Sequence, residues 1–211
     1  MRTGYKNEYL YKVKNISIAL CMSALIMSAM SIAYAEVRMP EFALLLDDFS
    51  SRTPVSGLRW EGFTDTVMGG ASEMTSTIVT DGGVSRLWMQ GNVSLANNGG
   101  FIQMRLKLSD RPKVFDGGRY RGVRLTVRGS GGDGFYLFAR TRQTRFPWKY
   151  YAAPFPVSGE WRTVDVPWSA FEPGKYGRSG EFRPDLLLSI ALTAAFKEFS
   201  PLLEVREIGF Y

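Results

Sequence analysis

Residues Val123-Arg124-Leu125-Thr126-Val127-Arg128 alternate strictly between apolar and charged or polar side chains. A period of two residues places the apolar side chains on one face of a β-strand and the polar ones on the other. Residues 102–108 repeat this pattern, with Gln103, Arg105 and Lys107 at the polar positions. Both segments therefore predict strands with one face on a core and the other in water.

Eight further strand-like runs follow residue 36, and no convincing helical segment lies among them. Glycine-rich turns separate these runs at residues 81–83, 97–100, 116–118 and 129–134. Short strands at such spacing are typical of an all-β sandwich. We predict an antiparallel jelly-roll β-sandwich of about eight to ten strands. The eight runs are residues 42–46, 76–80, 85–89, 135–140, 150–155, 162–166, 186–192 and 203–210.

The 211 residues include no histidine and a single cysteine, Cys21. Imidazole and thiolate are the side chains most easily poised near neutral pH. Their scarcity excludes a Ser-His-Asp triad, a Cys-His pair, a disulfide framework and the common zinc sites. A glycosidase with two carboxylates is the alternative, but Asp65, Asp133, Glu160 and Asp165 share no spacing that unites them. We predict that the protein is not an enzyme, with no catalytic residue, cofactor or metal site.

The first 35 residues read as a secretory signal peptide. Four basic residues and one acid precede an uncharged run at residues 16–33, and the small-x-small sequence Ala33-Tyr34-Ala35 ends it. We predict cleavage before Glu36, which leaves residues 36–211 as one domain in the periplasm or secreted. The alternative is an uncleaved leader that anchors the protein in the inner membrane. Cys21 follows Leu20, where a lipoprotein signal has a small residue, so we predict no lipid there.

The charge of the exported part is small. Of 26 basic and 20 acidic residues, four and one lie in residues 1–35, so the remainder carries a net charge of +3. This charge gives little attraction to polyanions, and we expect no nucleic-acid partner. Residues 129–134 match the G-x-G-x-x-G dinucleotide pattern, but a strand-like run follows where that pattern requires a helix. We therefore predict a glycine-rich turn and no nucleotide cofactor.

Two blocks carry a family resemblance: Trp60 with Phe-Thr-Asp-Thr-Val-Met-Gly-Gly-Ala-Ser at residues 63–72, and Gly-Asn-Val-Ser-Leu-Ala-Asn-Asn-Gly-Gly-Phe at residues 91–101. Later matches extend the likeness over about residues 47–211. The sequence resembles the CIA30 family, which includes complex I intermediate-associated protein 30, an assembly factor for respiratory NADH:ubiquinone oxidoreductase. The later matches are Tyr120-Arg121-Gly122, Tyr136, Trp161, Val164 to Pro167 and Phe171.

The resemblance implies a galactose-binding-like β-sandwich and, for some members, an assembly role without catalytic residues. Two features depart from the family pattern: the glycine loop at residues 129–134 is longer than a compact G-D-G, and the leader directs this chain out of the cytoplasm. We predict a non-enzymatic, chaperone-like interaction or assembly module, exported and with an unidentified protein client. The alternative is a carbohydrate-binding module that recognises a periplasmic or envelope glycan through loop residues.

The block around Asp65 has two interpretations. In the structural one, Asp65 caps a turn, Gly69 and Gly70 adopt positive φ, and Met68 fills the core. In the binding one, the glycines expose backbone amides to a ligand or partner, while Asp65 and Ser72 form hydrogen bonds to it.

The loop Asn97-Asn98-Gly99-Gly100 allows the same two interpretations. Asn and Gly tolerate left-handed backbone, and their amide groups also suit sugar hydroxyls or an irregular peptide. Arg105 follows on the polar side of the next strand. If both loops lie on one rim of the sandwich, Asp65, Ser72, Asn97, Asn98 and Arg105 would form a shallow polar groove.

Residues 140–151 form a second candidate that is both basic and aromatic. Rings and guanidinium groups together suit a sugar or an anionic lipid or protein surface. The alternative is a basic hairpin whose rings face the core. We assign Trp60, Trp161 and Trp168 to packing. The candidate residues are Arg140, Arg142, Arg145, Phe146, Trp148, Lys149, Tyr150 and Tyr151, of which Arg140, Trp148 and Tyr150 are predicted binding residues.

Overall fold

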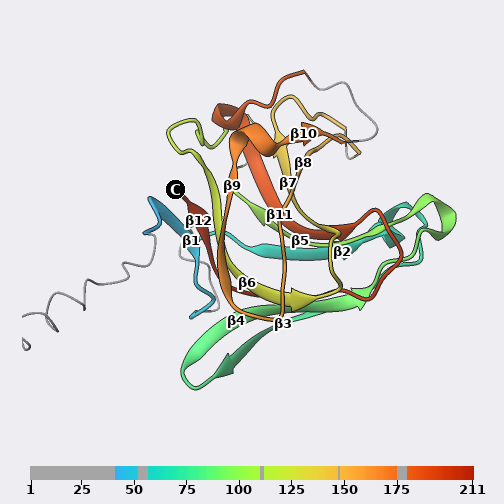
Figure 1. Cartoon of the computed structure of the whole chain (residues 1–211). Helices are drawn as coiled ribbons and strands as arrows, with labels where there is room; N and C mark the ends of the chain where they lie inside the picture. The colour runs from blue at the N-terminus through green and yellow to red at the C-terminus, as the bar shows by residue number, and fades with distance from the viewer. Residues whose placement is uncertain (1–40, 52–56, 110–111, 147, 175–179) are drawn as a thin grey trace, which may run out of the picture. The chain divides into compact units, whose positions relative to one another are not determined.

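The computed structural model describes residues 41–51, 57–109, 112–146, 148–174 and 180–211. The predicted leader and its cleavage site lie outside these residues. Residues 42–211 form one unit of two antiparallel sheets that face each other, as Figure 1 shows. The strands are β1 (Leu44–Asp47), β2 (Trp60–Thr64), β3 (Glu73–Asp81), β4 (Val84–Asn92), β5 (Phe101–Lys107), β6 (Gly122–Ser130), β7 (Phe135–Thr141), β8 (Tyr151–Pro154), β9 (Arg162–Pro167), β10 (Glu172–Pro173), β11 (Leu187–Ala195) and β12 (Leu202–Phe210).

The first sheet, called sheet 1, has the order β3-β4-β12-β6-β9, and β1 also pairs with β12. The second, sheet 2, has the order β10-β8-β7-β11-β5-β2. Four short 3₁₀ turns complete the described elements: η1 (Asp65–Met68), η2 (Ala96–Asn98), η3 (Trp168–Ala170) and η4 (Pro184–Leu186). No helix in the described ranges is long and apolar enough to cross a lipid bilayer.

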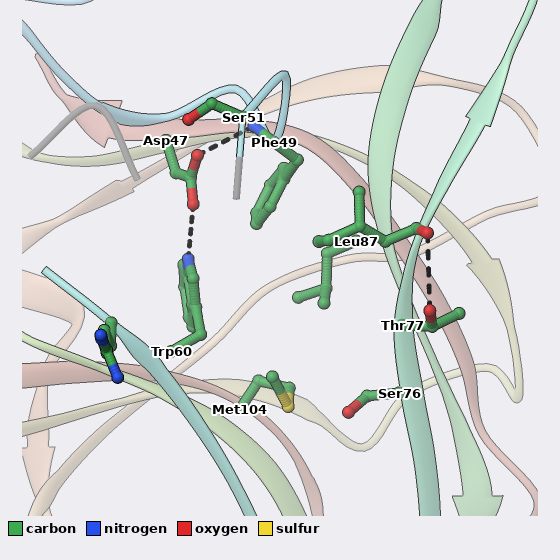
Figure 2. A pocket seen from close by; sticks show the side chains of 10 residues that line it. Asp47, Phe49, Ser51, Trp60, Ser76, Thr77, Leu87 and Met104 are labelled. Atoms are coloured by element: carbon green, nitrogen blue, oxygen red, sulfur yellow. Dashed lines mark hydrogen bonds between the residues drawn. The ribbon is translucent and has the colours of Figure 1, made fainter. Parts of the chain in front are cut away.

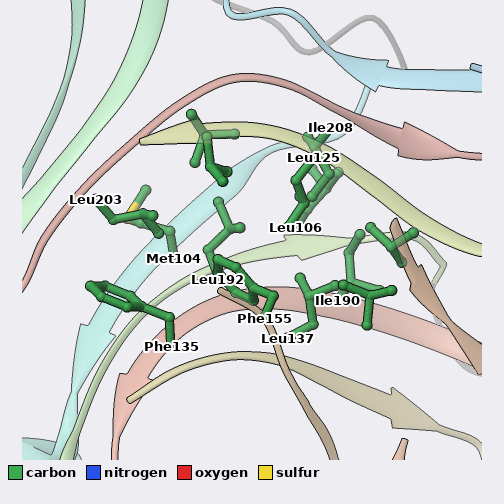
Figure 3. Close-up of a cluster of buried hydrophobic side chains, with 14 of the residues drawn as sticks. Met104, Leu106, Leu125, Phe135, Leu137, Phe155, Ile190, Leu192, Leu203 and Ile208 are labelled. Carbon is green, nitrogen blue, oxygen red and sulfur yellow. The ribbon is translucent and has the colours of Figure 1, made fainter. Parts of the chain in front are cut away.

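The core lies between the two sheets and confirms the predicted alternation. From β6 of sheet 1, Val123, Leu125 and Val127 are fully buried. From β5 of sheet 2, Ile102 and Leu106 are equally buried and belong to the same apolar cluster. Figure 3 shows the side chains of β5, β7 and β11 meeting those of β6 and β12. Full burial of one such aliphatic side chain stabilises the fold by about 1.5–3 kcal/mol, so this cluster holds the sheets together.

All ten predicted runs form strands, and most of these strands extend beyond the predicted ends. The described residues contain twelve strands, more than the predicted eight to ten, because β2 and β10 lack the alternating pattern. Strand β2 carries Gly62 near Met104 and Met74, where a Cβ atom would crowd both thioethers. A glycine within an edge strand breaks the apolar pattern that sequence analysis relies on.

The glycine-rich turns are confirmed. Gly82 and Gly83 adopt φ of 57° and 79° and reverse the chain between β3 and β4. The loop at residues 131–134 carries the chain from β6 in sheet 1 to β7 in sheet 2. A strand follows this loop, as predicted from its aromatic sequence.

The close approach of β6 to β12 gives a test of the packing. A Cβ atom at Gly129 would overlap the carbonyl oxygen of Leu202, whereas one at Gly159 meets no atom within 4 Å. We expect Gly129→Ala to lower the free energy of unfolding by about 1–3 kcal/mol, as overpacking does, and Gly159→Ala to change it by less than about 0.5 kcal/mol. Urea unfolding of both variants measures the difference. Equal stability of the two would contradict the packing described here.

Candidate functional site

Asp65, at the start of η1, is fully buried and joins three segments of the chain. Its carboxylate accepts hydrogen bonds from the backbone N–H groups of Ser72 (2.9 Å), Gly100 and Phe101 (3.3 Å). It also accepts one from the Ser72 hydroxyl (2.5 Å). Ser72 is buried as well, and its hydroxyl oxygen accepts a hydrogen bond from the backbone N–H of Ser94 at 2.9 Å. The two predicted loops therefore lie on one rim, fastened together by this carboxylate.

The glycines of the rim fit around Asp65. Gly69 closes η1 with φ of 87°. A Cβ atom at either Gly70 or Gly99 would overlap the Asp65 carboxylate, so both positions need glycine for close approach. The predicted positive φ is confirmed for Gly69 and wrong for Gly70, whose φ lies outside that range. Met68 does not fill the core, because 55% of it is exposed.

The rim is open to solvent at Asn97 and Asn98, whereas Gly100 is buried. Asn97 and Asn98 are exposed and adopt left-handed φ of 55° and 58°, as their residue types predict. Gly100 has φ of 127°. Asp65 and Ser72 lie inside the corner rather than on its surface, so ligand contact by these two side chains stays an untested prediction.

The hydrogen bonds at this corner set the charge of Asp65. Burial raises the pKa of the Asp65 carboxyl, but the donors from Ser72, Gly100 and Phe101 together outweigh it and leave the pKa below its ordinary value of 3.8. The carboxylate form thus stabilises the fold above that value, and this contribution is lost as the pH falls through the lowered pKa.

The outer face of sheet 2 carries a second apolar cluster, opposite the core. On β7, Leu137 points to the core while Tyr136 and Phe138 point outward, and on β5 Phe101 does the same. We call these outward rings, with their neighbours, the aromatic face. It consists of Phe63, Phe101, Tyr136, Phe138, Tyr150 and Phe196.

Several rings of the aromatic face contact one another, although they come from different segments of the chain. Tyr150 stacks on Phe138 with centroids 4.2 Å apart, and Phe196 contacts Tyr136 at 4.9 Å and Phe138 at 5.7 Å. Phe196 adopts φ of 73°, a conformation that is a rare outlier for a bulky residue. It is nevertheless 46% exposed. Its N–H donates to the carbonyl of Gly100 at 3.0 Å, which makes the rim and the aromatic face neighbours.

Polar groups border these rings on β2, β5 and β11. The Arg105 guanidinium donates to the Glu61 carboxylate at 2.5 Å and lies 4.8 Å from the centre of the Phe63 ring. The Thr193 hydroxyl donates to the amide oxygen of Gln103 at 3.4 Å. At its border the aromatic face therefore offers the partly exposed Arg105–Glu61 pair beside the rings, whereas Gln103 and Thr193 are buried.

The predicted basic and aromatic segment divides among three environments. Tyr151 is fully buried in the core, whereas Tyr150 belongs to the aromatic face. Phe146 and Trp148 are half exposed and stack on each other, with centroids 5.1 Å apart. Arg140 pairs with Ser189 across the sheet and donates to the Phe146 carbonyl at 2.9 Å.

Three of the predicted binding residues, Arg105, Arg140 and Tyr150, thus share the outer face of sheet 2. The sequence analysis missed Phe63, Phe101, Tyr136, Phe138 and Phe196 as members of this face. The available signal was the run Phe135-Tyr136-Leu137-Phe138, where both alternating positions are apolar or aromatic. Such a strand has no solvated polar face.

A separate cavity of about 430 Å³ lies between the edges of the two sheets, beside β2 and β3. Figure 2 shows Trp60 and Met104 on one side and Ser76, Thr77 and Leu87 on the other. Asp47 accepts hydrogen bonds from the Phe49 N–H at 2.9 Å and from Trp60 Nε1 at 2.7 Å. Burial raises the pKa of this carboxyl, although both hydrogen bonds act against the shift.

Among the described residues that line this cavity, Asp47 is the one acid, so they include no pair of carboxylates like that of a glycosidase. Among the described residues, no group of three or more Cys, Asp or Glu side chains is placed to hold a metal ion.

The tryptophan assignments are partly confirmed. Trp60 and Trp168 pack against the core, as predicted. Trp161 instead packs against the guanidinium groups of Arg128 and Arg206, at 4.8 and 4.0 Å from its ring centre.

The Asp65 corner gives a second test. Asp65→Asn replaces one acceptor oxygen with an NH₂ donor that faces backbone N–H groups, so we expect the free energy of unfolding at pH 7 to fall by about 2–4 kcal/mol. The difference from wild type should begin to shrink as the pH falls below 3.8, where the Asp65 carboxyl of the unfolded chain takes up a proton before that of the folded protein does. Urea unfolding between pH 3 and 7 measures both, with Asp81→Asn at the exposed β3–β4 turn as control. A pH-independent difference would contradict the role given to the charge.

Comparison with solved structures identifies the fold. A family 11 carbohydrate-binding module of a cellulosomal cellulase from Clostridium thermocellum has a TM-score of 0.61 at 14% identity, over 80% of this chain and 94% of the module. The same type of module in complex with a β-1,3-1,4-mixed-linked tetrasaccharide has a TM-score of 0.60 at 16% identity, over 79% and 94%. At these identities the likeness shows the fold alone, which is the expected galactose-binding-like jelly roll.

Comparison with sequences identifies the family. No curated protein matches the sequence. The family model described as complex I intermediate-associated protein 30 (CIA30) matches residues 48–196, which include the rim and all six residues of the aromatic face. Since this match covers more than half of the sequence, the chain belongs to the CIA30 family.

Proposed function

We propose that this chain is a non-enzymatic, chaperone-like assembly module that holds a protein client on its aromatic face and the adjoining rim. The observation that carries the proposal is the aromatic face itself, in a chain of the CIA30 family. Aromatic rings and arginine are the side chains enriched in the energetic centres of protein interfaces. On this face, the half-exposed Phe196 lies among further rings, and Arg105 stands at the border.

The conformation of Phe196 supports this assignment. A non-glycine residue held at positive φ costs about 1–3 kcal/mol, and such strain gathers at functional sites. The strained backbone places an apolar ring half in solvent, beside Tyr136 and Phe138. The strain lowers the stability of the fold and still leaves apolar area exposed. A partner that covers the Phe196 ring best explains why this conformation is kept.

Photo-crosslinking in cells tests the client. We expect p-benzoylphenylalanine at position 196 to capture a specific protein, and the same group at Val84, exposed on the β3–β4 hairpin, to capture none of it. Phe196→Ala should weaken binding of the captured protein at least about tenfold, as loss of an interface anchor does. Equal capture from both positions would contradict a client on the aromatic face.

Glycan binding by the same face is the second candidate. The fold is that of carbohydrate-binding modules, one of them solved with a mixed-linked tetrasaccharide. The rings of Tyr150 and Phe196 suit stacking on sugar rings, and the side chains of Arg105 and Glu61 suit hydrogen bonds to hydroxyl groups. A glycan array distinguishes the two candidate functions. Glycan binding is favoured if the wild type and Val84→Ala bind a defined glycan and Tyr150→Ala does not. If the wild type binds no glycan on the array, glycan binding is excluded as a function of this face.

We also propose that the protein acts outside the cytoplasm. The support is the basic, apolar and small-x-small order of residues 1–35. We expect the intact mass of protein recovered from the periplasm or medium to correspond to residues 36–211. The mass of the full chain, recovered with the membrane fraction, would instead indicate an inner-membrane anchor.

A further inference from the structure

Arg206 lies on the outer face of sheet 1 without an acidic partner among the described residues. Its guanidinium carbon is 4.0 Å from the centre of the Trp161 ring. Its Nε atom is buried and has no hydrogen-bond partner. An unpaired buried donor costs about 1–3 kcal/mol, so its retention calls for an explanation.

A β-bulge directs this side chain outward. In the pairing of β12 with β6, Val205 lies opposite Val127 and Glu207 opposite Thr126, so Arg206 is the extra residue between two consecutive pairs. Bulges re-aim a side chain and gather next to binding sites. The bulge thus separates Arg206 from the regular ladder and places it against Trp161.

A second arginine shares the same ring. The Arg128 guanidinium lies 4.8 Å from the Trp161 centre and donates to the Glu204 carboxylate at 2.5 Å. Glu204 is nine-tenths buried and also accepts a hydrogen bond from Arg86. The Glu204 carboxylate therefore forms ion pairs with both Arg86 and Arg128, and Arg206 adds a third positive charge.

The other acids near this cluster do not neutralise Arg206. Glu207 accepts a hydrogen bond from the Thr126 hydroxyl at 2.9 Å. Glu160 is exposed and acts electrostatically on Arg128. Neither forms an ion pair with Arg206 within the part of the chain that the structure describes. The three arginines of the cluster are thus matched in number by three acids, but Glu204 is shared by Arg86 and Arg128, and Arg206 is left without an ion pair among the described residues.

We propose that Arg206, with Arg128 and Trp161, forms a binding site for an oxyanion group: the sulfate, phosphate or carboxylate of a ligand. The Trp161 ring fixes the plane of the Arg206 guanidinium, which presents its two terminal NH₂ groups to the ligand. A planar guanidinium binds such groups through two parallel, charge-assisted hydrogen bonds. Arg128 supplies a second positive charge on the same ring. The site is on the sheet opposite the aromatic face and does not depend on the proposed client.

Titration of the protein with sodium sulfate, phosphate and acetate, each against sodium chloride at equal ionic strength, tests the site. We expect saturable binding by isothermal titration calorimetry at one site, with an affinity at least tenfold weaker in Arg206→Gln. Arg206→Lys, which keeps the charge but loses the planar fork, should also bind more weakly than wild type. Tighter binding of the dianions than of acetate would assign a sulfate or phosphate ligand, and the reverse a carboxylate.

Arg183→Gln is the matched control, because Arg183 is an exposed arginine paired with Asp185 at 2.6 Å. It should bind each anion as the wild type does. Thermal unfolding of every variant without anion checks that the fold is kept. If Arg206→Gln does not fold, the binding comparison is made with Arg206→Lys. Equal anion binding by wild type and both Arg206 variants, or none above chloride in the wild type, would overturn the proposal.

Discussion

The Asp65 carboxylate is the interaction on which the arrangement of the rim depends. It accepts hydrogen bonds from Ser72, Gly100 and Phe101, which lie up to 36 positions from Asp65 in the sequence, and Gly70 and Gly99 leave room for it. The carbonyl of Gly100 also accepts a hydrogen bond from the Phe196 N–H. The same corner therefore fixes the end of β11 and the strained backbone of Phe196. A buried charge that is fully paired thus orders the loops from which the aromatic face begins.

The sequence predicted the fold well where strands have one wet face. In Val123–Arg128 and in β5, the alternation of side chains predicted which residues reach the core, and all ten predicted runs became strands. The two edge strands of sheet 2 were missed because they lack an alternating pattern: β2 contains Gly62, and β10 has only two residues. Tertiary contacts decide such elements, and periodicity does not report them.

The candidate site was less predictable. The glycine and asparagine loops and the Asp65 block could be read as one rim, since residue type limits backbone conformation. Met68 was misplaced because an apolar side chain in a tight turn need not reach the core. The aromatic face required the pairing of β5, β11 and β7, which brings Phe101, Ala195 and Phe138 onto one surface from distant parts of the chain. No local pattern gives that order of strands.

The absence of histidine has a consequence for both proposed surfaces. Arginine keeps its charge at any physiological pH, and the carboxyls of Asp65 and Glu204 have lowered pKa values because their hydrogen bonds outweigh the effect of burial. Between about pH 5 and 8, the Asp65 carboxylate of the rim and the Glu204 carboxylate of the Arg206 cluster therefore keep their charge. We therefore expect anion binding at the proposed Arg206 site to respond to salt more than to acidity in this range.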